Sequence, residues 1–452
     1  MMNRCSKGRI LGKLLIEWTI IIAVAAVLLL PAPAHALQPL PDFLRAAAQH
    51  NFDNREARAT AVQRVHEATQ AWGRLLPSLT IGGDYIHNQY LGAAEIPTGA
   101  PPTGGILPTR HVVITPYDQW DANFSAALTL IDVAAWNNVG AAAATRDAQR
   151  ERAAASALEV QKTVARTYYQ LIGATAVGRA ARRTLVAAED NARFIDIRTR
   201  AGLAQDLDLK RALAEVERDK QAIEDADYST VTLSRSLETV SGLTPEGDPA
   251  QDAPALPADD LRDEQPLAAF SGGVDGLPSV RAAALDQHAA DLTASASQAA
   301  LYPTLSAQFN ERATNAFGFG ESPYFTFEVL ATWKLDFGSY EASRAQAAAV
   351  DASKVRADRA RAAAADTLFT DWHSVRTQIA KSRAARTSLD ASRLALSVAR
   401  DKYGSGKATL LDVVQAERDE FSAEVTDIQA EADLAAARAA LQLSAGRSLV
   451  TP

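Results

Sequence analysis

The sequence predicts a mainly α-helical chain that contributes strands to a membrane β-barrel. Three observations predict this fold class. Long stretches are almost free of proline and are rich in alanine, arginine, glutamate and glutamine, which are good helix formers. Shorter segments between them alternate apolar and polar residues with the period of two that strands require. Both patterns occur twice, so we expect duplicated long α-helical hairpins built on one plan.

The start of the chain has the pattern of a secretory signal peptide. Arg4, Lys7, Arg9 and Lys13 precede the apolar run TIIIAVAAVLLL. At roughly 12 residues, this run is too short to span a bilayer comfortably. The small residues of PAPAHA follow it and predict cleavage after Ala36, with an uncut membrane anchor as the alternative. The only cysteine lies within this segment, so we expect no disulfide and no thiolate metal ligand in the mature protein.

The chain is acidic, with a formal net charge of −8 at pH 7. Loss of the signal peptide removes four basic residues and one glutamate, which makes the mature chain three charges more negative. An acidic exported chain is a poor candidate for binding nucleic acid, because phosphate groups repel it. We therefore expect no nucleic-acid partner.

Each half of the chain is expected to carry a pair of long helices. The first long helix covers about 133–200, and its counterpart covers about 340–402. Roughly 65 residues at 1.5 Å each make a helix of about 100 Å, which needs neighbours along its length. The returning helix of the first pair provides a heptad seam. Its seam residues stand alternately three and four apart from Leu209 to Val240, with the charged Lys220 among them.

The two halves match at a fixed offset of 204 positions. Sliding the stretch GLAQDLDLKRALAEV onto GKATLLDVVQAERD places Gly202 on Gly406 and Asp208 on Asp412. We therefore expect Gly202 and Gly406 at the two turns between paired long helices, with one aspartate at the start of each returning helix.

The domain organisation follows from this duplication. We expect, in chain order, a signal peptide at 1–36, a first structural repeat at 37–242 with a β-hairpin at 78–131, a joining segment at 243–278, and a second structural repeat at 279–452 with a β-hairpin at 304–337. Shorter helices are expected to open the two repeats, near 42–73 and 279–300.

The clearest alternation occurs in QWDANFSAALTLI and FTFEVLATWKLDF. In both segments one set of alternate positions is apolar and the other is largely polar. Each half is therefore expected to contain two strands joined as a hairpin, with a long Gly- and Pro-rich loop at 89–117 in the first half. A soluble sheet, half buried against helices, is the alternative interpretation.

Aromatic residues near the strand ends favour a barrel in a membrane. An interfacial girdle would consist of Tyr85, Tyr117, Trp120, Tyr324 and Trp333. Strands of about 10 residues cross a membrane when they are tilted. Four strands cannot close a barrel, and lipid tolerates no unpaired strand edge. The chain must therefore oligomerise, and a dimer would supply eight strands whereas a trimer would supply twelve.

Several short motifs, taken in their order, resemble the TolC-like outer membrane channels. They are the entries LLPSL and LYPTL before the hairpins, WKLDFG at the end of the last strand, and YGSGKATLLDVVQAERD at the second turn. The resemblance covers nearly all of the mature chain. It implies a homotrimer with a 12-stranded barrel in the outer membrane lipid and a long α-helical tunnel in the periplasm.

The resemblance also implies a function and partners. The channel would be the passive exit duct of a tripartite efflux or type I secretion system. An inner-membrane transporter would energise it through a periplasmic adaptor that docks at the tunnel tip. At that tip the turns would contain Gly202, Leu203, Gly406 and Lys407, and these residues would contact the adaptor.

Four further residues acquire expected roles from the same resemblance. Asp208 and Asp412 would face the narrowing pore, and Tyr403 would help to latch the closed tip. Gln415 stands where a second pore aspartate can follow, which is a departure from the family pattern. A plain helix-start role, favoured by the helix dipole, is the alternative for both aspartates.

Sequence motifs give no sign of catalysis. The seven histidines show no metal-ligand spacing such as HExxH, and no nucleophile motif such as GxSxG occurs. We therefore expect a protein that is not an enzyme and that has no metal site and no cofactor. The alternative to a channel is a soluble periplasmic coiled-coil scaffold that acts as an interaction protein.

Overall fold

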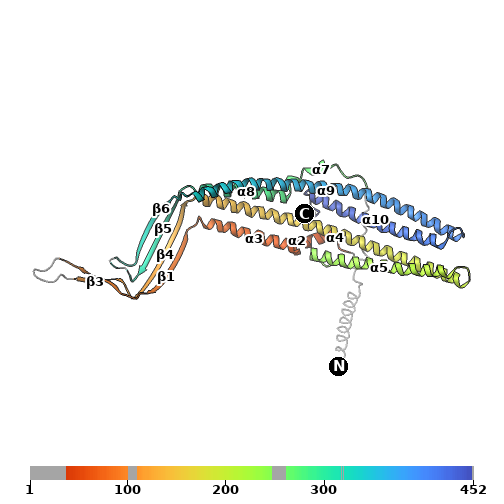
Figure 1. Cartoon of the computed structure of the whole chain (residues 1–452), viewed down its shortest axis with the longest axis horizontal. Coiled ribbons are helices and arrows are strands. Elements are labelled where there is room, and N and C mark those ends of the chain that lie inside the picture. The colour runs from red at the N-terminus through yellow and green to blue at the C-terminus, as the bar shows by residue number, and fades with distance from the viewer. Residues whose placement is uncertain (1–36, 100–108, 247–260, 317, 319, 450–452) are drawn as a thin grey trace, which may run out of the picture.

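The computed structural model describes residues 37–99, 109–246, 261–316, 318 and 320–449. The expected signal peptide at 1–36 and part of the joining segment lie outside these residues. The described chain is elongated, with a β-sheet at one end of its long axis and the turns of two helical hairpins at the other (Figure 1). The sheet and the expected tip are therefore at opposite ends.

Helices make up most of the chain. The described helical elements are α2 (Leu40–His50), α3 (Phe52–Gly73), α4 (Val133–Arg200), α5 (Asp206–Ser241), the short α7 (Ala268–Ser271) and η1 (Val274–Gly276), α8 (Pro278–Ala299), α9 (Phe337–Gly404) and α10 (Leu410–Ser444). The long helices α4 and α9 each contain 68 residues. This length confirms the expectation of helices about 100 Å long.

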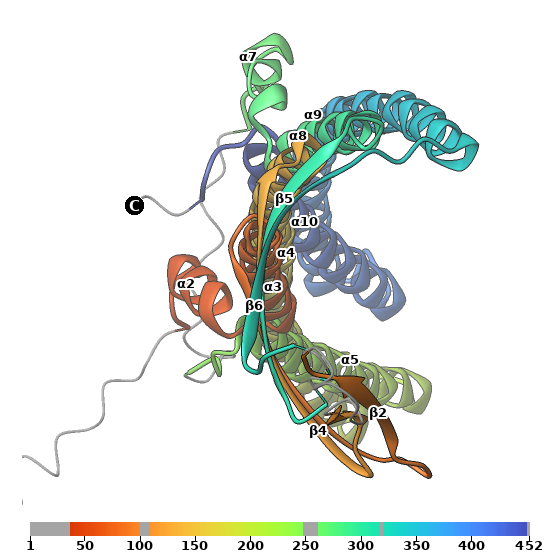
Figure 2. The same ribbon diagram turned by 90° about the vertical axis from the view of Figure 1, so that its left-hand side faces the viewer.

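The helices lie side by side rather than as a closed bundle. Near the sheet, α4 contacts α3 and α8, and α8 contacts α9. Near the turns, α5 takes the place of α3 beside α4, and α10 takes the place of α8 between α4 and α9. Figure 2, which looks along the long axis from the sheet end, shows these helices spread around an open arc. Each level of the arc therefore contains four helices.

The helix expected near 42–73 is two helices. Asn51 breaks it with an extended ψ of 136°, and its side chain caps α3 by accepting from the Asn54 N–H at 3.1 Å. The Asn51 amide also donates to the Val240 carbonyl at 2.9 Å. Next to this contact Gly242 has φ +72°, and a Cβ built on it would lie 2.4 Å from the Cβ of His50. The break therefore seats the helix pair α2–α3 against the end of α5.

Two apolar clusters hold the middle of the molecule together. The first joins α2, α4 and α5 and contains the fully buried Phe43, Val164 and Leu171. The second joins α7, α9 and α10 around Val375 and Leu434. Burial of such side chains is worth about 1.5–3 kcal/mol each. The clusters therefore fix the long helices at mid-length, between the sheet and the turns.

The main sheet has four antiparallel strands in the order β1 (Ser78–His87), β4 (Asp118–Ile131), β5 (Thr304–Thr314) and β6 (Tyr324–Thr332). The first two strands come from the first half of the chain and the last two from the second half. The join between the halves is the β4–β5 pair, in which Phe124 lies opposite Glu311. The hairpins predicted at 78–131 and 304–337 thus meet in one sheet whose edges are β1 and β6.

The loop expected at 89–117 contains structure of its own. Strands β2 (Gly92–Pro97) and β3 (Thr109–Thr115) pair as a separate two-stranded sheet. The expectation of only two strands in the first half was therefore wrong. The sequence concealed β2 because GAAEIP begins with three small residues and ends in proline, so its alternation is weak.

The heptad seam of α5 is also different from the one expected. Val216, Ala226 and Leu237 are buried as predicted, but Lys220 is exposed and pairs with Glu217 at 2.7 Å. The buried charged residues of α5 are Glu215 and Asp219 instead. A long charged side chain remains hydrated when it can, so Lys220 points to water.

Candidate channel entrance and membrane surface

The two helix–helix turns have the same backbone geometry. Gly202 and Gly406 have φ values of +73° and +71°. The Leu203 N–H donates to the Arg198 carbonyl at 2.8 Å, and the Lys407 N–H donates to the Lys402 carbonyl at 2.8 Å. These bonds span the same number of residues and are typical of a glycine-terminated helix. The repeat in the sequence therefore corresponds to the same turn structure in both halves at the tip.

Asp412 has a capping role at the start of α10. Its Oδ2 accepts from the Thr409 N–H at 2.8 Å, and its own N–H donates to the Thr409 hydroxyl at 3.3 Å, which makes a capping box. The Thr409 N–H and hydroxyl hold the pKa of Asp412 below its usual value. The helix-start role that the sequence left open is thus present at this residue.

Asp208 has the same position in α5 but a different environment. Gln205 stands at its N-cap, where the second repeat has Thr409, and its side chain makes no capping bond. Asp208 is half-buried, and its nearest basic group is the Arg211 guanidinium at 3.9 Å. The Asp208 carboxylate is therefore not engaged in capping its own helix, as that of Asp412 is, and can interact with groups outside the helix.

Tyr403 lies in a small apolar cluster that joins the two hairpins near their turns. It packs beside Leu410 and Val414 of α10, and Ile195 of α4 is fully buried among them. The guanidinium of Arg198 lies 6.0 Å from the centre of the Tyr403 ring. Gln415, by contrast, is exposed and donates to Asp419 at 2.8 Å. The ring of Tyr403 is therefore placed to hold the hairpins together.

The turns present apolar side chains to solvent. Leu203, Leu207 and Leu411 are exposed, and Lys407 is exposed beside them. Leu207 and Leu411 occupy matching positions in the two repeats. An exposed apolar patch with a polar rim commonly marks a protein interaction site.

A network of charged residues joins the hairpins farther from the turns, and the sequence analysis missed it. Glu215 of α5 accepts three hydrogen bonds from the Arg418 guanidinium of α10, two from Nε at 3.0 Å and one from Nη2 at 2.5 Å. Arg183 of α4 pairs with Glu424 of α10 at 2.6 Å. The predicted seam of α5 does not include Glu215, and a buried glutamate is uncommon in a helix interface. Helix α10 is thus tied to both α4 and α5.

One face of the main sheet is apolar and exposed. Directly paired residues point to the same side, so the register assigns each residue to a face. The apolar face includes Leu79, Ile81, Tyr85, Trp120, Phe124, Phe309, Phe325, Phe327 and Val329. Of these, Ile81 is 82% exposed and Phe325 is 69% exposed. The charged residues of this face lie toward the end farthest from the helices, and they are His87, Asp118 and Glu311.

The opposite face of the sheet is polar. Its members include Thr80, Asp84, Asp121, Asn123, Ser125, Gln308, Asn310, Arg312, Thr326 and Glu328. The buried Asp121 accepts from the Arg312 guanidinium at 2.8 Å. A sheet with an exposed apolar face and a polar reverse face is typical of a membrane barrel wall around water.

Residues 43–243 and 276–447 match the family model for outer membrane efflux proteins. The chain belongs to this family. No curated protein sequence matches the chain. As a member of the outer membrane efflux family, it is an outer membrane channel protein with a periplasmic helical part, and it is not an enzyme.

Solved structures share the fold of this efflux family member. CusC has a TM-score of 0.77 and 17% identity, with 90% of this chain and 92% of CusC covered. The open state of the Neisseria gonorrhoeae MtrE channel has a TM-score of 0.71 and 19% identity, with 91% and 90% covered. The Campylobacter jejuni CmeC channel has a TM-score of 0.73 and 14% identity, with 91% and 86% covered.

The predicted aromatic girdle of this efflux channel lies near both ends of the strands. At the far end Tyr85 lies opposite Trp120, and Tyr117 precedes β4. At the helix end Trp333 follows β6, and its indole N–H donates to the Leu301 carbonyl at 3.0 Å. Tyr324 differs from the others, because it lies opposite Arg312 on the polar face.

The sequence analysis missed a second aromatic pair at the helix end of the sheet. Trp72 of α3 and Trp136 of α4 are in edge-to-face contact, with ring centres 5.5 Å apart. Both are about half exposed. Their positions, at the last turn before β1 and the first turn after β4, are a signal that could have found them. With Trp333 they mark where the sheet meets the helices.

Two properties of the described residues bear on other sites. None of the helices in the described ranges is long and apolar enough to cross a membrane. Among the same residues, no group of three or more His, Cys, Asp or Glu side chains is arranged to hold a metal ion.

Proposed function

We propose that three copies of this chain form a passive channel through the outer membrane. The channel serves as the exit duct of a tripartite efflux or type I secretion system. A periplasmic adaptor connects it to an inner-membrane transporter, which supplies the energy. Three copies of the four-stranded sheet make a barrel of twelve strands, and three copies of the helical arc make the tunnel below it.

The observation that carries this proposal is the exposed apolar face of a sheet with two free edges. In water, leaving the aromatic and aliphatic side chains of this face exposed would cost about 25 cal/mol of free energy per Å² of apolar surface. In lipid they are in their preferred surroundings, and the polar face then lines the barrel interior. The edges β1 and β6 each need a partner in lipid, which β6 and β1 of neighbouring copies supply.

The tip residues are assigned as part of the same proposal. Asp208 and Asp412 lie at the tunnel entrance, where three copies would place six carboxylates around one opening. The turns at Gly202 and Gly406, with Leu203 and Lys407, contact the adaptor. Tyr403 helps to keep the entrance closed. Gln415 is uncharged and stands where the family can have a second pore aspartate, so the trimer lacks a ring of negative charge at that position. The two repeats, 37–242 and 279–452, are the units of this architecture, joined by 243–278.

Two measurements on the protein purified in detergent test the proposal. Light scattering corrected for bound detergent should give the mass of a trimer. Addition of this trimer to a planar bilayer should produce discrete conductance steps. A monomer that stays monodisperse without detergent, and that washes off membranes during cell fractionation, would overturn the channel and favour the soluble scaffold.

A further inference from the structure

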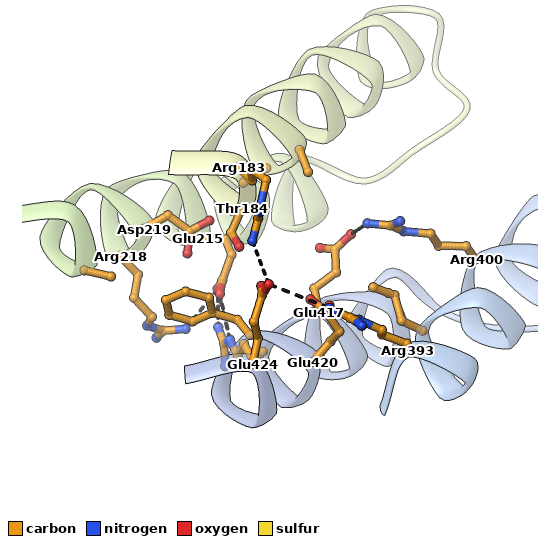
Figure 3. A pocket seen from close by; sticks show the side chains of 16 residues that line it. Arg183, Thr184, Glu215, Arg218, Asp219, Arg393, Arg400, Glu417, Glu420 and Glu424 are labelled. Carbon is orange, nitrogen blue, oxygen red and sulfur yellow. Dashed lines mark hydrogen bonds and ion pairs between the residues drawn. The ribbon is translucent and has the colours of Figure 1, made fainter. Parts of the chain in front are cut away.

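A cavity of about 620 Å³ lies between the two helical hairpins of the chain (Figure 3). Helices α4, α5, α9 and α10 all contribute to it. Its volume is within the range of about 300–1,000 Å³ that is common for small-molecule sites. Ala187, Ala222, Leu396 and Phe421 give it apolar wall area. The cavity could therefore hold a small organic molecule with an apolar part.

The polar wall of the cavity consists of carboxylates and guanidinium groups. The carboxylates are Glu215, Asp219, Glu417, Glu420 and Glu424, and the guanidinium groups belong to Arg183, Arg218, Arg393, Arg400 and Arg418. With five groups of each sign, the lining has no net charge. What distinguishes the groups is how they are paired.

Every guanidinium group of the lining has a carboxylate partner. Arg218 pairs with Glu215 at 2.9 Å, and Arg418 pairs with the same carboxylate. Arg400 pairs with Glu417 at 3.0 Å. The remaining pairs are Arg183 with Glu424 at 2.6 Å and Arg393 with Glu420 at 3.5 Å. Since each cation is already matched, the cavity does not offer a free site for an anion.

Asp219 is the carboxylate left over from this pairing. It is 5% exposed, and its Oδ2 is buried without a hydrogen-bond partner in the part of the chain that the structure describes. Burial, together with the smaller effect of the Glu215 and Glu417 charges, raises the pKa of Asp219 to about 6 against the opposing charges of Arg218 and Arg418. The side chain is therefore mostly ionised at neutral pH. A buried carboxylate oxygen without a donor is costly and favours a ligand that supplies one.

We propose that this cavity binds a small amphiphilic primary amine. Its ammonium group donates a hydrogen bond to Asp219 Oδ2, and its apolar part lies against Leu396 and Phe421. A metal ion fits less well, since the described residues form no group that could ligate one. An ammonium group supplies the missing donor as a charge-assisted hydrogen bond to this carboxylate. The site lies within one chain, so it does not depend on conduction through the trimer.

The test uses monodansylcadaverine, a primary amine with an environment-sensitive naphthalene ring. Its fluorescence is titrated at pH 7.5 with the purified full-length protein in detergent, against a blank of the same micelles. Dansylamide carries the same ring without the cation and serves as the ligand control. We expect saturable binding of the amine, and binding of dansylamide that is about tenfold weaker or worse.

Two variants and a change of pH locate the site. Asp219→Asn keeps the shape and removes the charge, so the amine should bind about tenfold more weakly or worse. Glu224→Gln removes an exposed charge from the same helix and should bind like the wild type. The unmodified protein should also lose amine binding between pH 7.5 and pH 5, because Asp219 becomes protonated.

Three results would overturn the proposal. They are equal binding of the amine by the wild type and Asp219→Asn, equal binding of the amine and dansylamide by the wild type, and wild-type binding that does not change between pH 7.5 and pH 5. The last two use unmodified protein, so they decide the matter even if Asp219→Asn fails to fold. Conductance steps in a bilayer are measured separately, so failure here is distinguishable from failure of the channel.

Discussion

Thr409 and Asp412 cap one another at the start of α10, with the Thr409 N–H 2.8 Å from Asp412 Oδ2. The first repeat lacks this exchange, because Gln205 stands where Thr409 would be and makes no capping bond. Two turns with the same glycine geometry therefore begin their returning helices with different local stability.

Replacement of Thr409 by Ala should loosen the first turn of α10. Loss of an N-cap side chain costs about 1 kcal/mol, so amide exchange in this turn should become roughly fivefold faster. Hydrogen-exchange mass spectrometry of the detergent-purified protein measures it. Gln205→Ala is the matched control and should leave exchange in α5 unchanged. An equal effect of both substitutions would contradict the capping asymmetry.

The paired substitution Asp208→Asn with Asp412→Asn should lower the cation selectivity of the channel. Carboxylates around a narrow opening concentrate cations through a focused field, and asparagine removes the charge with little change of shape. Reversal potentials in a planar bilayer under a salt gradient measure the selectivity, and block by trivalent cations should weaken as well. Glu224→Gln is the control for charge removal away from the tip. Wild-type selectivity in the double variant would leave the aspartates as helix-start residues only.

Truncation of Tyr403 to Ala should raise the conductance of the closed channel. Its ring packs beside Leu410 and Val414 and lies near Arg198, so its loss removes a contact between the hairpins. Tyr403→Phe keeps the ring, and within the described part of one chain the hydroxyl has no hydrogen-bond partner to lose. The phenylalanine variant should therefore raise the conductance less than the alanine variant, and an equal effect of both would contradict a role for the ring. Single-channel recordings of both variants test this order.

A lysine at Ile81 should prevent stable assembly in the membrane. Ile81 is on the apolar face, where lysine at mid-membrane depth costs about 2–4 kcal/mol per copy. Thr80→Lys, one residue away on the polar face, is the matched control and should still assemble. The amount of trimer in the outer membrane fraction reports the result. Equal assembly of both variants would contradict the assignment of the two faces.

Asp219→Asn should raise the melting temperature at pH 7.5. The pKa of Asp219 is raised in the folded state, so ionisation destabilises the fold as pH rises from about 4 through about 6. At pH 5 most copies of wild-type Asp219 are already neutral, and the advantage of the variant should shrink. Thermal unfolding at the two pH values, with Glu224→Gln as control, measures it. An advantage that is the same at both pH values would be unrelated to the charge of Asp219.

Much of the fold could be predicted because it is specified locally. Proline-poor stretches specify the long helices, and Gly202 and Gly406 specify their turns through a backbone that favours glycine. The alternation around Phe124 and Phe327 specifies which side of each strand is apolar. These signals depend on neighbours within a few residues, so a single sequence contains them.

Contacts between segments far apart in sequence could not be predicted in the same way. The exposure of Lys220 and the burial of Asp219 depend on where α10 lies beside α5. The break at Asn51 depends on the end of α5, which receives its amide.

By itself, the sequence determined the helix lengths, the two glycine turns, the strand faces and the need for partner copies, since all of these follow from local periodicity and from unpaired strand edges. Only the tertiary structure decided which charged groups meet. Among the described residues, Glu215 pairs with two guanidinium groups, whereas Asp219 Oδ2 has no hydrogen-bond partner. The physical reason is that pairing among ten charged side chains depends on distances of a few ångströms between four helices, and no periodicity in the sequence specifies those distances.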